Sequence, residues 1–393
     1  MRSRLGAAFI AILTAASACG GSAQVQARAF EMLTDTSGAY PVVTARGDPP
    51  QAALEQLGVV RPDAEVGFSR LRAIALDPRG GVWALDAKER TLQHFDDAGR
   101  LIGSRGRVGE GPGEFESPYA IAADRSGLLL WDPGLSRATR WTPDGELDAS
   151  WLWFGMRATG SPVHWYLTSS GPRLFMPLGS PQQTHLAFFS MAVDGQRDTL
   201  YAPRPKRISL GETRTCDGAG GSTWFWPSPF QPEISSAPWR GAVAVTTGAD
   251  YAIALVAPGG DTLRVLRREL PARPVTEADW DSASAEYRVQ SDTLTLTNCR
   301  GEYRRVESFP SITDLATDSD GRLWVEAETV AGSVWDLWAG DSLVASMPAP
   351  ARAAAWRGPR PSMLGDRMAV PVVDTAGGMD VVVYRMRGLP GMN

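Results

Sequence analysis

The sequence predicts an all-β protein, a six-bladed β-propeller closed by an N-terminal strand, and two observations carry that prediction. The first is a motif that occurs twice, because residues 74–83 (IALDPRGGVW) return as residues 121–132 (IAADRSGLLLWD). The second is composition: 41 Gly and 29 Pro in 393 residues favour many turns over long helices. A period of about 40–50 residues, built from short apolar runs and Asp/Gly turns, is typical of propeller blades.

Residues 1–18 are expected to be a signal peptide that takes no part in the fold. Arg2 and Arg4 provide a positive start, and the apolar stretch Leu5–Thr14 is too short to span a membrane. Small residues then precede Cys19, which leaves two cleavages open: a lipobox whose Cys19 is acylated, or an ordinary A-x-A site. The lipobox is preferred because the cysteine directly follows the small residues. It resembles bacterial lipoproteins, although Ala16 stands where that family usually has Leu.

This leader predicts the location of the protein. We expect an exported lipoprotein of the cell envelope, at the outer membrane or in the periplasm, with a soluble secreted protein as the alternative. The lipid on Cys19 would be its single contact with a membrane, and residues 19–38 would form the tether.

Residues 39–393 are expected to form the propeller. The segment Ala39–Arg46 looks like an isolated strand, and we expect it to close the ring by joining the last blade. Residues 51–70 would then be a connection with a short helical turn. Six blades are expected to begin near residues 71, 119, 163, 241, 312 and 367.

Two insertions interrupt the repeat on either side of the fourth blade. Residues 204–230 are rich in Gly, Ser and Pro and are expected to be a long loop. Residues 268–310 separate blades four and five, and the capping-box spacing of Thr276 and Asp279 predicts a short helix through about Val289.

Each insertion contains one cysteine, Cys216 and Cys299. In an oxidising compartment two cysteines that remain after Cys19 are most simply a disulfide, and two separate buried thiols are the alternative. A Cα separation above about 7 Å would exclude the bridge.

Three features give the chain a family resemblance. They are the Asp-x-x-Gly turns followed by Val/Leu-Trp, the Asp-x-x-Gly-x-Leu outer turns, and the Gly-rich linker of residues 103–115. Together they resemble NHL-type six-bladed propellers, especially the bacterial secreted or lipid-anchored ones. That family commonly opens with an Asp-Ser-Ala-Gly-like turn, which residues 35–38 match loosely. The resemblance implies the fold and an exported location, but no reaction, because propellers carry both binding modules and unrelated enzymes.

One face of such a propeller is expected to bind a partner. The connections between blades line this face, together with the turns between second and third strands. The charged candidates there are Arg105, Arg107, Glu110, Glu114, Asp86 and Asp132, and the aromatic candidates in the long loop are Trp224 and Trp226. The competing structural interpretation is that such charges pair within their own turns and that Trp224 and Trp226 cap the junction between blades three and four. The other tryptophans are expected to pack between blades.

Composition argues against several other functions. A net charge of −5 gives no basic footprint for nucleic acid. The three histidines, His94, His164 and His185, are scattered, and the chain has two asparagines, so neither a metal nor another cofactor is expected. The sequence therefore favours a monomeric, non-catalytic envelope propeller that binds a protein, peptide or glycan on one face. The alternative is a propeller hydrolase or lyase that uses carboxylates and a divalent cation in the central channel.

Overall fold

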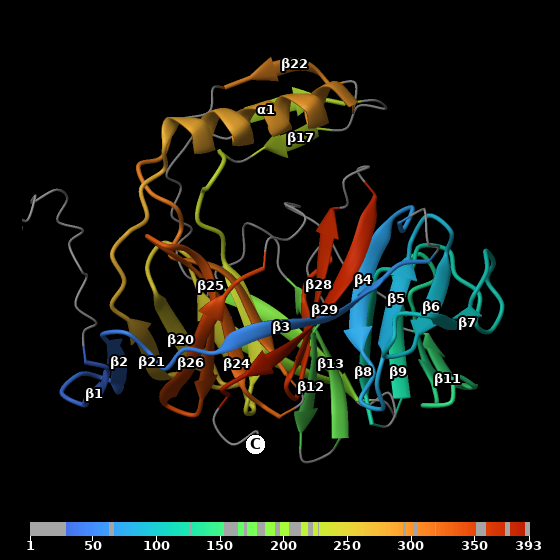
Figure 1. Ribbon diagram of the computed structural model, residues 1–393, viewed down its shortest axis with the longest axis horizontal. Coiled ribbons are helices and arrows are strands. Elements are labelled where there is room, and N and C mark those ends of the chain that lie inside the picture. The colour runs from blue at the N-terminus through green and yellow to red at the C-terminus, as the bar shows by residue number, and fades with distance from the viewer. Residues whose placement is uncertain are drawn as a thin grey trace, which may run out of the picture.

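The structure is a computed structural model, and it describes residues 29–62, 67–125, 127–152, 164–168, 171–178, 185–192, 197–203, 214–218, 223–226, 228–293, 296–301, 305–318, 320–350, 359–373 and 378–389. These residues form an all-β fold with one helix, α1 (Figure 1). The predicted leader and Cys19 lie outside the described residues. Within the part of the chain that the structure describes, no helix is long and apolar enough to cross a membrane.

Six sheets of the described chain share one pattern, in which four strands run antiparallel to their neighbours. The first three sheets are β4 (Leu71–Leu76), β5 (Val82–Asp86), β6 (Thr91–Phe95) and β7 (Leu101–Arg105); β8 (Ala120–Asp124), β9 (Gly127–Asp132), β10 (Arg137–Trp141) and β11 (Leu147–Leu152); and β12 (His164–Thr168), β13 (Gly171–Leu178), β14 (His185–Ala192) and β15 (Arg197–Pro203). The next three are β18 (Ser235–Trp239), β19 (Ala242–Thr246), β20 (Ala252–Val256) and β21 (Thr262–Arg268); β23 (Ile312–Thr317), β24 (Leu323–Thr329), β25 (Gly332–Ala339) and β26 (Ser342–Pro348); and β27 (Ser362–Leu364), β28 (Arg367–Val373), β29 (Met379–Arg387) and β3 (Ala53–Val60).

The first strands of these sheets lie next to one another. Strand β4 contacts β8, β8 contacts β12, β12 contacts β18, β18 contacts β23, and β27 contacts β4. Sheets that meet through their first strands and diverge through their last strands have the arrangement of propeller blades.

The apolar core is divided into clusters that lie between neighbouring sheets. One cluster joins Ile253 and Leu266 of the fourth sheet to Leu323 and Trp338 of the fifth. Others join the fifth sheet to the sixth, the sixth to the first, and the first to the second. Trp324, Trp335 and Trp338 belong to these clusters and are among the largest fully buried side chains, so these tryptophans pack between sheets as expected.

In the first and second sheets the repeated turn depends on a glycine. Gly81 and Gly127 have φ values of 85° and 134°, and a Cβ at either position would lie 2.0 Å from a backbone carbonyl oxygen, that of Phe95 or Trp141. Because no side chain fits so close to the neighbouring strand, only glycine allows the first hairpin to pack there. Gly81 and Gly127 are therefore structurally equivalent. The Asp-x-x-Gly motif alone would instead align Gly80 with Gly127.

The N-terminal segment differs from the prediction. Residues 42–46 form β2 (Val42–Arg46), which pairs in parallel with β21 of the fourth sheet and with β1 (Glu31–Asp35), not with the last sheet. The outer strand of the last sheet is β3, which pairs with β29. The connection with a short helical turn expected at residues 51–70 is wrong for residues 53–60, which form β3. The mostly exposed side chains of β3 show no apolar alternation that would indicate a strand. Residues 31–35, expected in the tether, are also a strand.

We call residues 31–60 the strap, because they follow the outer edges of three consecutive sheets. After β2 pairs with β21, Gln51 forms a bridge with Ser346 of β26, and β3 then completes the sixth sheet. In Figure 1 the blue strap runs across the outside of β26 and β29. The strap thus covers part of each of these edges with backbone hydrogen bonds.

The two insertions form a separate small lobe, which we call the disulfide lobe: β16 (Arg214–Asp217), β17 (Thr223–Trp226), β22 (Thr297–Arg300) and α1 (Glu277–Thr293). The long loop predicted at residues 204–230 thus contains a hairpin, in which Cys216 faces Trp224. Its Gly- and Ser-rich turn suggested a loop, but the run Thr223–Trp226 has β-branched and aromatic residues that suit a strand.

Candidate binding face

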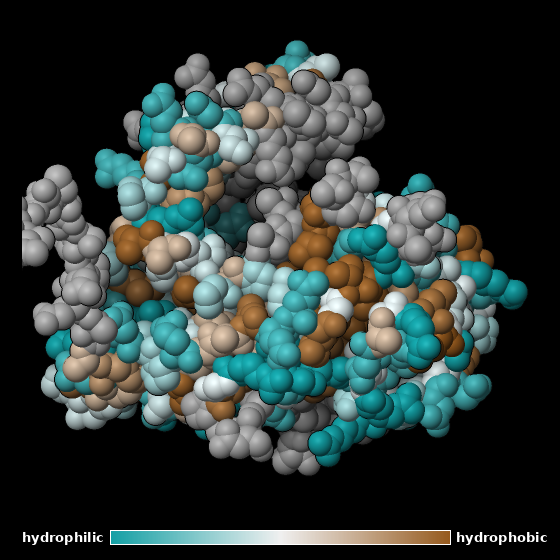
Figure 2. All heavy atoms as spheres, viewed as in Figure 1, coloured by the Kyte–Doolittle hydropathy of each residue, from teal (hydrophilic) through white to brown (hydrophobic). Residues whose placement is uncertain are grey.

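The connections 106–119, 204–234 and 269–311 all lead from the last strand of one sheet to the first strand of the next. Because strand direction alternates, these connections lie at the same end of the sheets as the turns between second and third strands. We call this end the insertion face. Figure 1 shows the disulfide lobe standing above it, and Figure 2 shows the surface hollowed between the lobe and the body of sheets.

The disulfide lobe is held together covalently. Cys216 and Cys299 are disulfide-bonded, with Cα atoms 4.1 Å apart, on the neighbouring strands β16 and β22. This distance lies within the limit set for the predicted bridge. Helix α1 starts with reciprocal hydrogen bonds: the Thr276 hydroxyl accepts from the Asp279 amide, and the Asp279 carboxylate accepts from the Thr276 amide and hydroxyl. The hydrogen bonds from Thr276 hold the pKa of Asp279 below its usual value.

The predicted charges in the connection 106–119 hold that loop in shape. Arg107 Nε donates to Glu114 Oε1 at 2.7 Å, and the Gly111 amide donates to Glu114 Oε2 at 2.8 Å. These two contacts, led by the Gly111 hydrogen bond, lower the pKa of Glu114. Arg137 Nη1 donates to the Glu110 carbonyl oxygen, and this contact ties the loop to the second sheet.

Two further predicted residues, Asp86 and Asp132, are buried and structural. The carboxylate of Asp86 accepts hydrogen bonds from the amides of Arg70 and Lys88. Asp132, one repeat later, accepts from the amides of Glu116, Ser117, Gly134 and Leu135. Their hydrogen bonds join the connection that precedes each sheet to the turn between its second and third strands. Because Asp86 and Asp132 are only 3% and 2% exposed, they are not presented to a ligand. Their occurrence at the repeat period is the sequence signal of this role.

Arg105 joins two sheets. Its Nε donates to the carbonyl oxygen of Gly145, in the turn between β10 and β11, at 2.8 Å. Trp224 and Trp226 lie on β17 in the disulfide lobe, above the sheets in Figure 1. Along the chain, the predicted charges thus belong to the first two sheets and the connection between them, and the predicted tryptophans belong to β17 of the disulfide lobe.

Residues at the start of the first strands form a set that sequence reasoning missed. Arg72 and Thr313 are extra residues in β-bulges of β4 and β23, since the register shifts between Leu71 and Ala73 and between Ile312 and Asp314. The guanidinium of Arg72 lies 3.7 Å from the ring centre of Tyr119, which immediately precedes β8. The repeat could have revealed this set, because Arg72, Tyr119 and Thr313 precede matching apolar runs.

Arg360 belongs to the same set, two residues before β27. Its Nη1 lies 2.7 Å from Asp314 Oδ1 and donates to the Leu315 carbonyl oxygen at 3.2 Å. Arg360 therefore spans the gap between the fifth and sixth sheets, as Arg72 spans the gap between the first and second. Asp314 is buried, whereas the Arg360 side chain keeps 30% of its surface exposed. We call Arg72, Tyr119, Thr313 and Arg360 the mouth ring.

An aromatic and charged group marks the base of the disulfide lobe. Arg273 Nη1 pairs with Glu328 Oε2 at 2.5 Å, and its guanidinium lies 4.2 Å from the ring centre of Phe309. Phe309 in turn packs on Phe230, with ring centroids 4.4 Å apart. These contacts connect both insertions to the fifth sheet and fix where the lobe starts.

The acidic side chains near the mouth ring are partnered. Asp314 pairs with Arg360, Glu328 pairs with Arg273, and Glu326, which is 4% exposed, accepts from the Thr313 hydroxyl at 2.8 Å. In the described ranges no group of three or more His, Cys, Asp or Glu side chains is placed to hold a metal ion.

Comparison with known proteins gives no family assignment. No family model matches the chain, and no curated protein matches it. Solved structures similar to it include a member of the DUF4221 family from Bacteroides vulgatus (8% identity, 86% of this chain and 99% of that one, TM-score 0.49). Others are the calcium-binding protein regucalcin from Agrobacterium tumefaciens (15%, 86% and 95%, 0.40) and the PQQ-bound aldose sugar dehydrogenase from Streptomyces coelicolor (14%, 86% and 100%, 0.41). At such identities and TM-scores, the function has to be argued from this chain's own residues.

Proposed function

We propose that this chain is a six-bladed β-propeller of the cell envelope that binds a protein, peptide or glycan on its insertion face and catalyses no reaction. One observation carries the proposal. The two longest connections between its sheets leave from the same end and are joined by the Cys216–Cys299 disulfide into one lobe. Loops supported by a rigid scaffold are where binding sites are usually built.

Exposed apolar residues at the same end of the sheets support a protein or peptide ligand. Val108 and Val330 are 62% and 64% exposed, in a connection between sheets and in a turn between second and third strands, and Val373, the last residue of the second strand β28, is 55% exposed. Valine side chains held out in turns lose little further freedom on binding, and their burial by a partner is favourable.

The partnered carboxylates favour binding over catalysis. A general acid or base needs a carboxyl group that can exchange a proton with a substrate, and a cation site needs several oxygen ligands that converge. Asp314 and Glu328 instead form ion pairs with arginines that bridge sheets or insertions. A hydrolase or lyase that used Asp314 or Glu328 as its acid or base would have to break that residue's ion pair during the reaction.

The experiment uses a photo-reactive amino acid at Val330 or Val373 in the full-length protein in native envelopes. Leu263, which is 48% exposed at the start of β21 and therefore at the opposite end of the sheets, is the matched control. We expect a discrete adduct, identified by mass spectrometry, from the two valine sites and none from Leu263. Adducts from Leu263 alone would place the binding site on the other face.

Two substitutions test how the insertion face binds. Trp226→Ala in β17 should weaken capture of the adduct-forming partner more than Arg107→Ala does. Arg107 is 81% exposed and already paired with Glu114, so it contributes mainly to orientation and loop shape. Circular dichroism checks that both variants fold. Equal capture by wild type and both variants would move the site away from the lobe and the connection 106–119.

A further inference from the structure

We infer that a corner of the molecule, at the end opposite the insertion face, lies against the membrane to which Cys19 is predicted to be attached. Three exposed apolar side chains, which we call the apolar corner, form it: Leu33, Tyr40 and Leu263 are 37%, 38% and 48% exposed. The inference goes beyond the proposed binding function and rests on the envelope location that this proposal includes. It adds a second contact with the membrane to the lipid on Cys19.

Backbone pairing brings the members of the apolar corner together. Strand β2 pairs in parallel with β21, and the Val265 amide donates to the Pro41 carbonyl oxygen at 3.0 Å. Tyr40, which directly precedes Pro41, therefore lies beside the start of β21, where Leu263 is the extra residue of a β-bulge. Leu33 lies on β1 of the same hairpin. The three side chains thus belong to neighbouring strands at one edge of the fourth sheet.

The position of the predicted anchor selects a membrane as the partner of the apolar corner. Glu31, the first residue of β1, is 12 positions after Cys19, and 12 residue steps span no more than about 43 Å. A lipid on Cys19 therefore keeps the hairpin of β1 and β2 close to the membrane surface. Binding of a tethered patch is effectively intramolecular, so a few apolar side chains make a contact that would be weak between free molecules.

The chemistry of the apolar corner suits the interface between lipid and water. Tyrosine is enriched there because its ring is apolar and its hydroxyl stays hydrated, and leucine side chains are stabilised by burial among acyl chains. Arg264, the cation next to Leu263, is paired with Asp341. The exposed carboxylates of Asp35 and Asp261 add negative charge. The apolar corner should therefore prefer zwitterionic over anionic lipids.

The same contact orients the insertion face. Strand β21 starts at the end of the sheets opposite to that face, and Figure 1 shows β1 and β2 at the lower left and the disulfide lobe at the top. A membrane against the apolar corner therefore leaves the disulfide lobe pointing to the solution, where a partner can reach it.

The test places a photo-reactive amino acid at Tyr40 or Leu263 of the full-length protein in native envelopes and identifies lipid adducts by mass spectrometry. Ile102 is the matched control, because it is the extra residue of the β-bulge in β7 and is 58% exposed. It lies on the first sheet, with two sheets between it and the fourth on either side. We expect about tenfold fewer lipid adducts from Ile102, the ratio that a preference of about 1.4 kcal/mol gives.

A substitution tests the apolar corner while the anchor is kept. With the probe at Tyr40, Leu263→Asp should reduce the yield of lipid adducts about fivefold, because a carboxylate resists leaving water. Ile102→Asp is the matched substitution and should leave the yield unchanged, and both variants should stay in the detergent-rich phase. In reconstituted vesicles the yield from Tyr40 should be higher with phosphatidylcholine than with phosphatidylglycerol.

Equal yields from Tyr40, Leu263 and Ile102, no lipid adduct from the apolar corner, or adducts there with a second copy of the chain would overturn the inference. The binding face is judged separately. Its test seeks protein adducts at Val330 and Val373 and none at Leu263, and a lipid adduct at Leu263 differs from a protein adduct in mass.

Discussion

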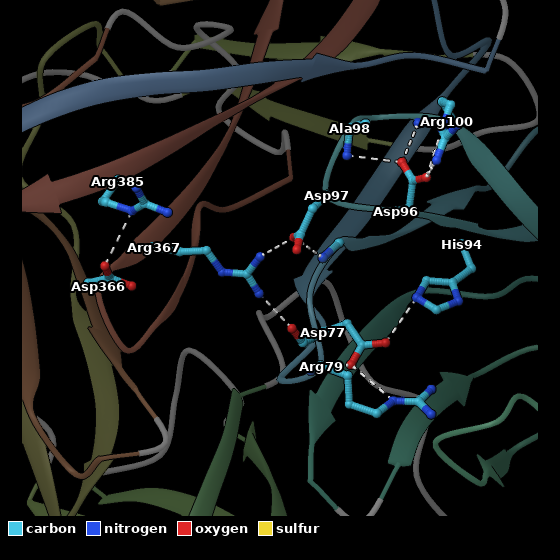
Figure 3. Close-up of polar contacts among 11 residues, drawn as sticks. Asp77, Arg79, His94, Asp96, Asp97, Ala98, Arg100, Asp366, Arg367 and Arg385 are labelled. Atoms are coloured by element: carbon cyan, nitrogen blue, oxygen red, sulfur yellow. Dashed lines mark hydrogen bonds and ion pairs between the residues drawn. The ribbon is translucent and has the colours of Figure 1, made fainter.

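The carboxylate of Asp77 lies 2.9 Å from the imidazole Nε2 of His94. The His94 ring is stacked on Trp83, with centroids 3.7 Å apart and planes 5° apart. In the fifth sheet the matching aspartate, Asp318, instead accepts a hydrogen bond from the indole of Trp324 at 2.8 Å. In the fifth sheet the tryptophan of this turn, Trp324, thus donates a hydrogen bond to the aspartate, whereas in the first sheet Trp83 stacks on the histidine that contacts the aspartate. Figure 3 shows His94 facing Asp77.

The Asp77–His94 contact predicts a specific loss of stability in acid. Burial opposes ionisation of Asp77, but the contacts with His94 and with the Arg79 amide and guanidinium outweigh it and hold the pKa of Asp77 below its ordinary value of 3.8. Because the folded pKa is depressed, this stabilisation is complete at neutral pH and is lost as pH falls below about 4. We expect Asp77→Asn to lower the free energy of unfolding by about 1–2 kcal/mol at pH 7.

Urea unfolding at a series of pH values measures this effect. The difference between wild type and Asp77→Asn should shrink as the pH falls toward 3, because protonation then removes the same charge from wild type. A difference that stays constant over this range would show that ionisation of Asp77 is not what stabilises the turn.

Arg367 is predicted to be a strong contact between the sixth and first sheets. Its Nη1 lies 2.6 Å from Asp97 Oδ1, and its Nη2 donates to the Asp77 carbonyl oxygen at 2.7 Å (Figure 3). Arg367→Met, which keeps the aliphatic stem, should cost about 2–3 kcal/mol, because a partly buried carbonyl loses its donor. Arg385→Met is the control from the same sheet: its pair with Asp366 spans 3.5 Å between half-exposed side chains and should cost under about 0.5 kcal/mol. Thermal melting of both variants gives the comparison.

The disulfide is predicted to stabilise mainly the lobe. The two cysteines are 83 positions apart, and the chain-entropy model gives about 4–5 kcal/mol for a loop of that size. The double variant Cys216→Ser/Cys299→Ser should therefore become sensitive to limited proteolysis within residues 204–234 and 269–311 before the sheets unfold. Reductant should sensitise wild type in the same way and leave the double variant unchanged. Equal resistance of oxidised wild type and variant would mean that packing alone holds the lobe.

The strap is predicted to stabilise the fourth sheet through β2. Val43 and Ala45 are 3% and 1% exposed and belong to the cluster between the fourth and fifth sheets. Val43→Ala should cost about 1.5–2.5 kcal/mol, from two lost methyl groups and the cavity they leave. Leu33→Ala on β1, where the side chain is 37% exposed, should cost far less. Chemical unfolding of the two variants tests this order, and a reversed order would mean that β2 contributes little.

The lipid anchor stays a prediction, because Cys19 lies outside the described residues. Cys19→Ala should move the protein from the detergent-rich phase to the aqueous phase in a phase-partitioning assay, since acylation supplies the affinity for membranes. Unchanged partitioning would leave the ordinary signal-peptide cleavage as the explanation.

Sequence reasoning succeeded where local chemistry determines the structure. The four-stranded sheets that begin at Leu71 and Ile312 are confirmed, because their Asp/Gly turns and apolar alternation specify hairpins without help from distant residues. The prediction for residues 51–60 is wrong because β3 is a strand only through its hydrogen bonds to β29 at the other end of the sequence. Nothing in its own mostly exposed residues indicates that pairing.

The site was predicted less well, for a physical reason. Charged residues in turns are conspicuous in a sequence. The carboxylates of Asp86, Asp132 and Glu114, however, accept hydrogen bonds from backbone amides of adjacent loops, so they have a structural role. Arg72 acquires its position from a β-bulge, and Arg360 from contacts with a different sheet. An alignment of the starts of the repeats would have indicated Arg72, because Arg72, Tyr119 and Thr313 precede matching apolar runs.

The strap also constrains the order of folding. Glu55 on β3 and Arg387 on β29 form an ion pair although they are 332 positions apart, so the sixth sheet cannot be completed until nearly all of the described chain is available. Contacts at such separations in sequence slow folding, and until they form, folding intermediates expose unpaired strand edges. A chain that emerges progressively, from a ribosome or through a translocation pore, therefore holds β3 unpaired until its last strand follows, whereas β2 can already pair with β21.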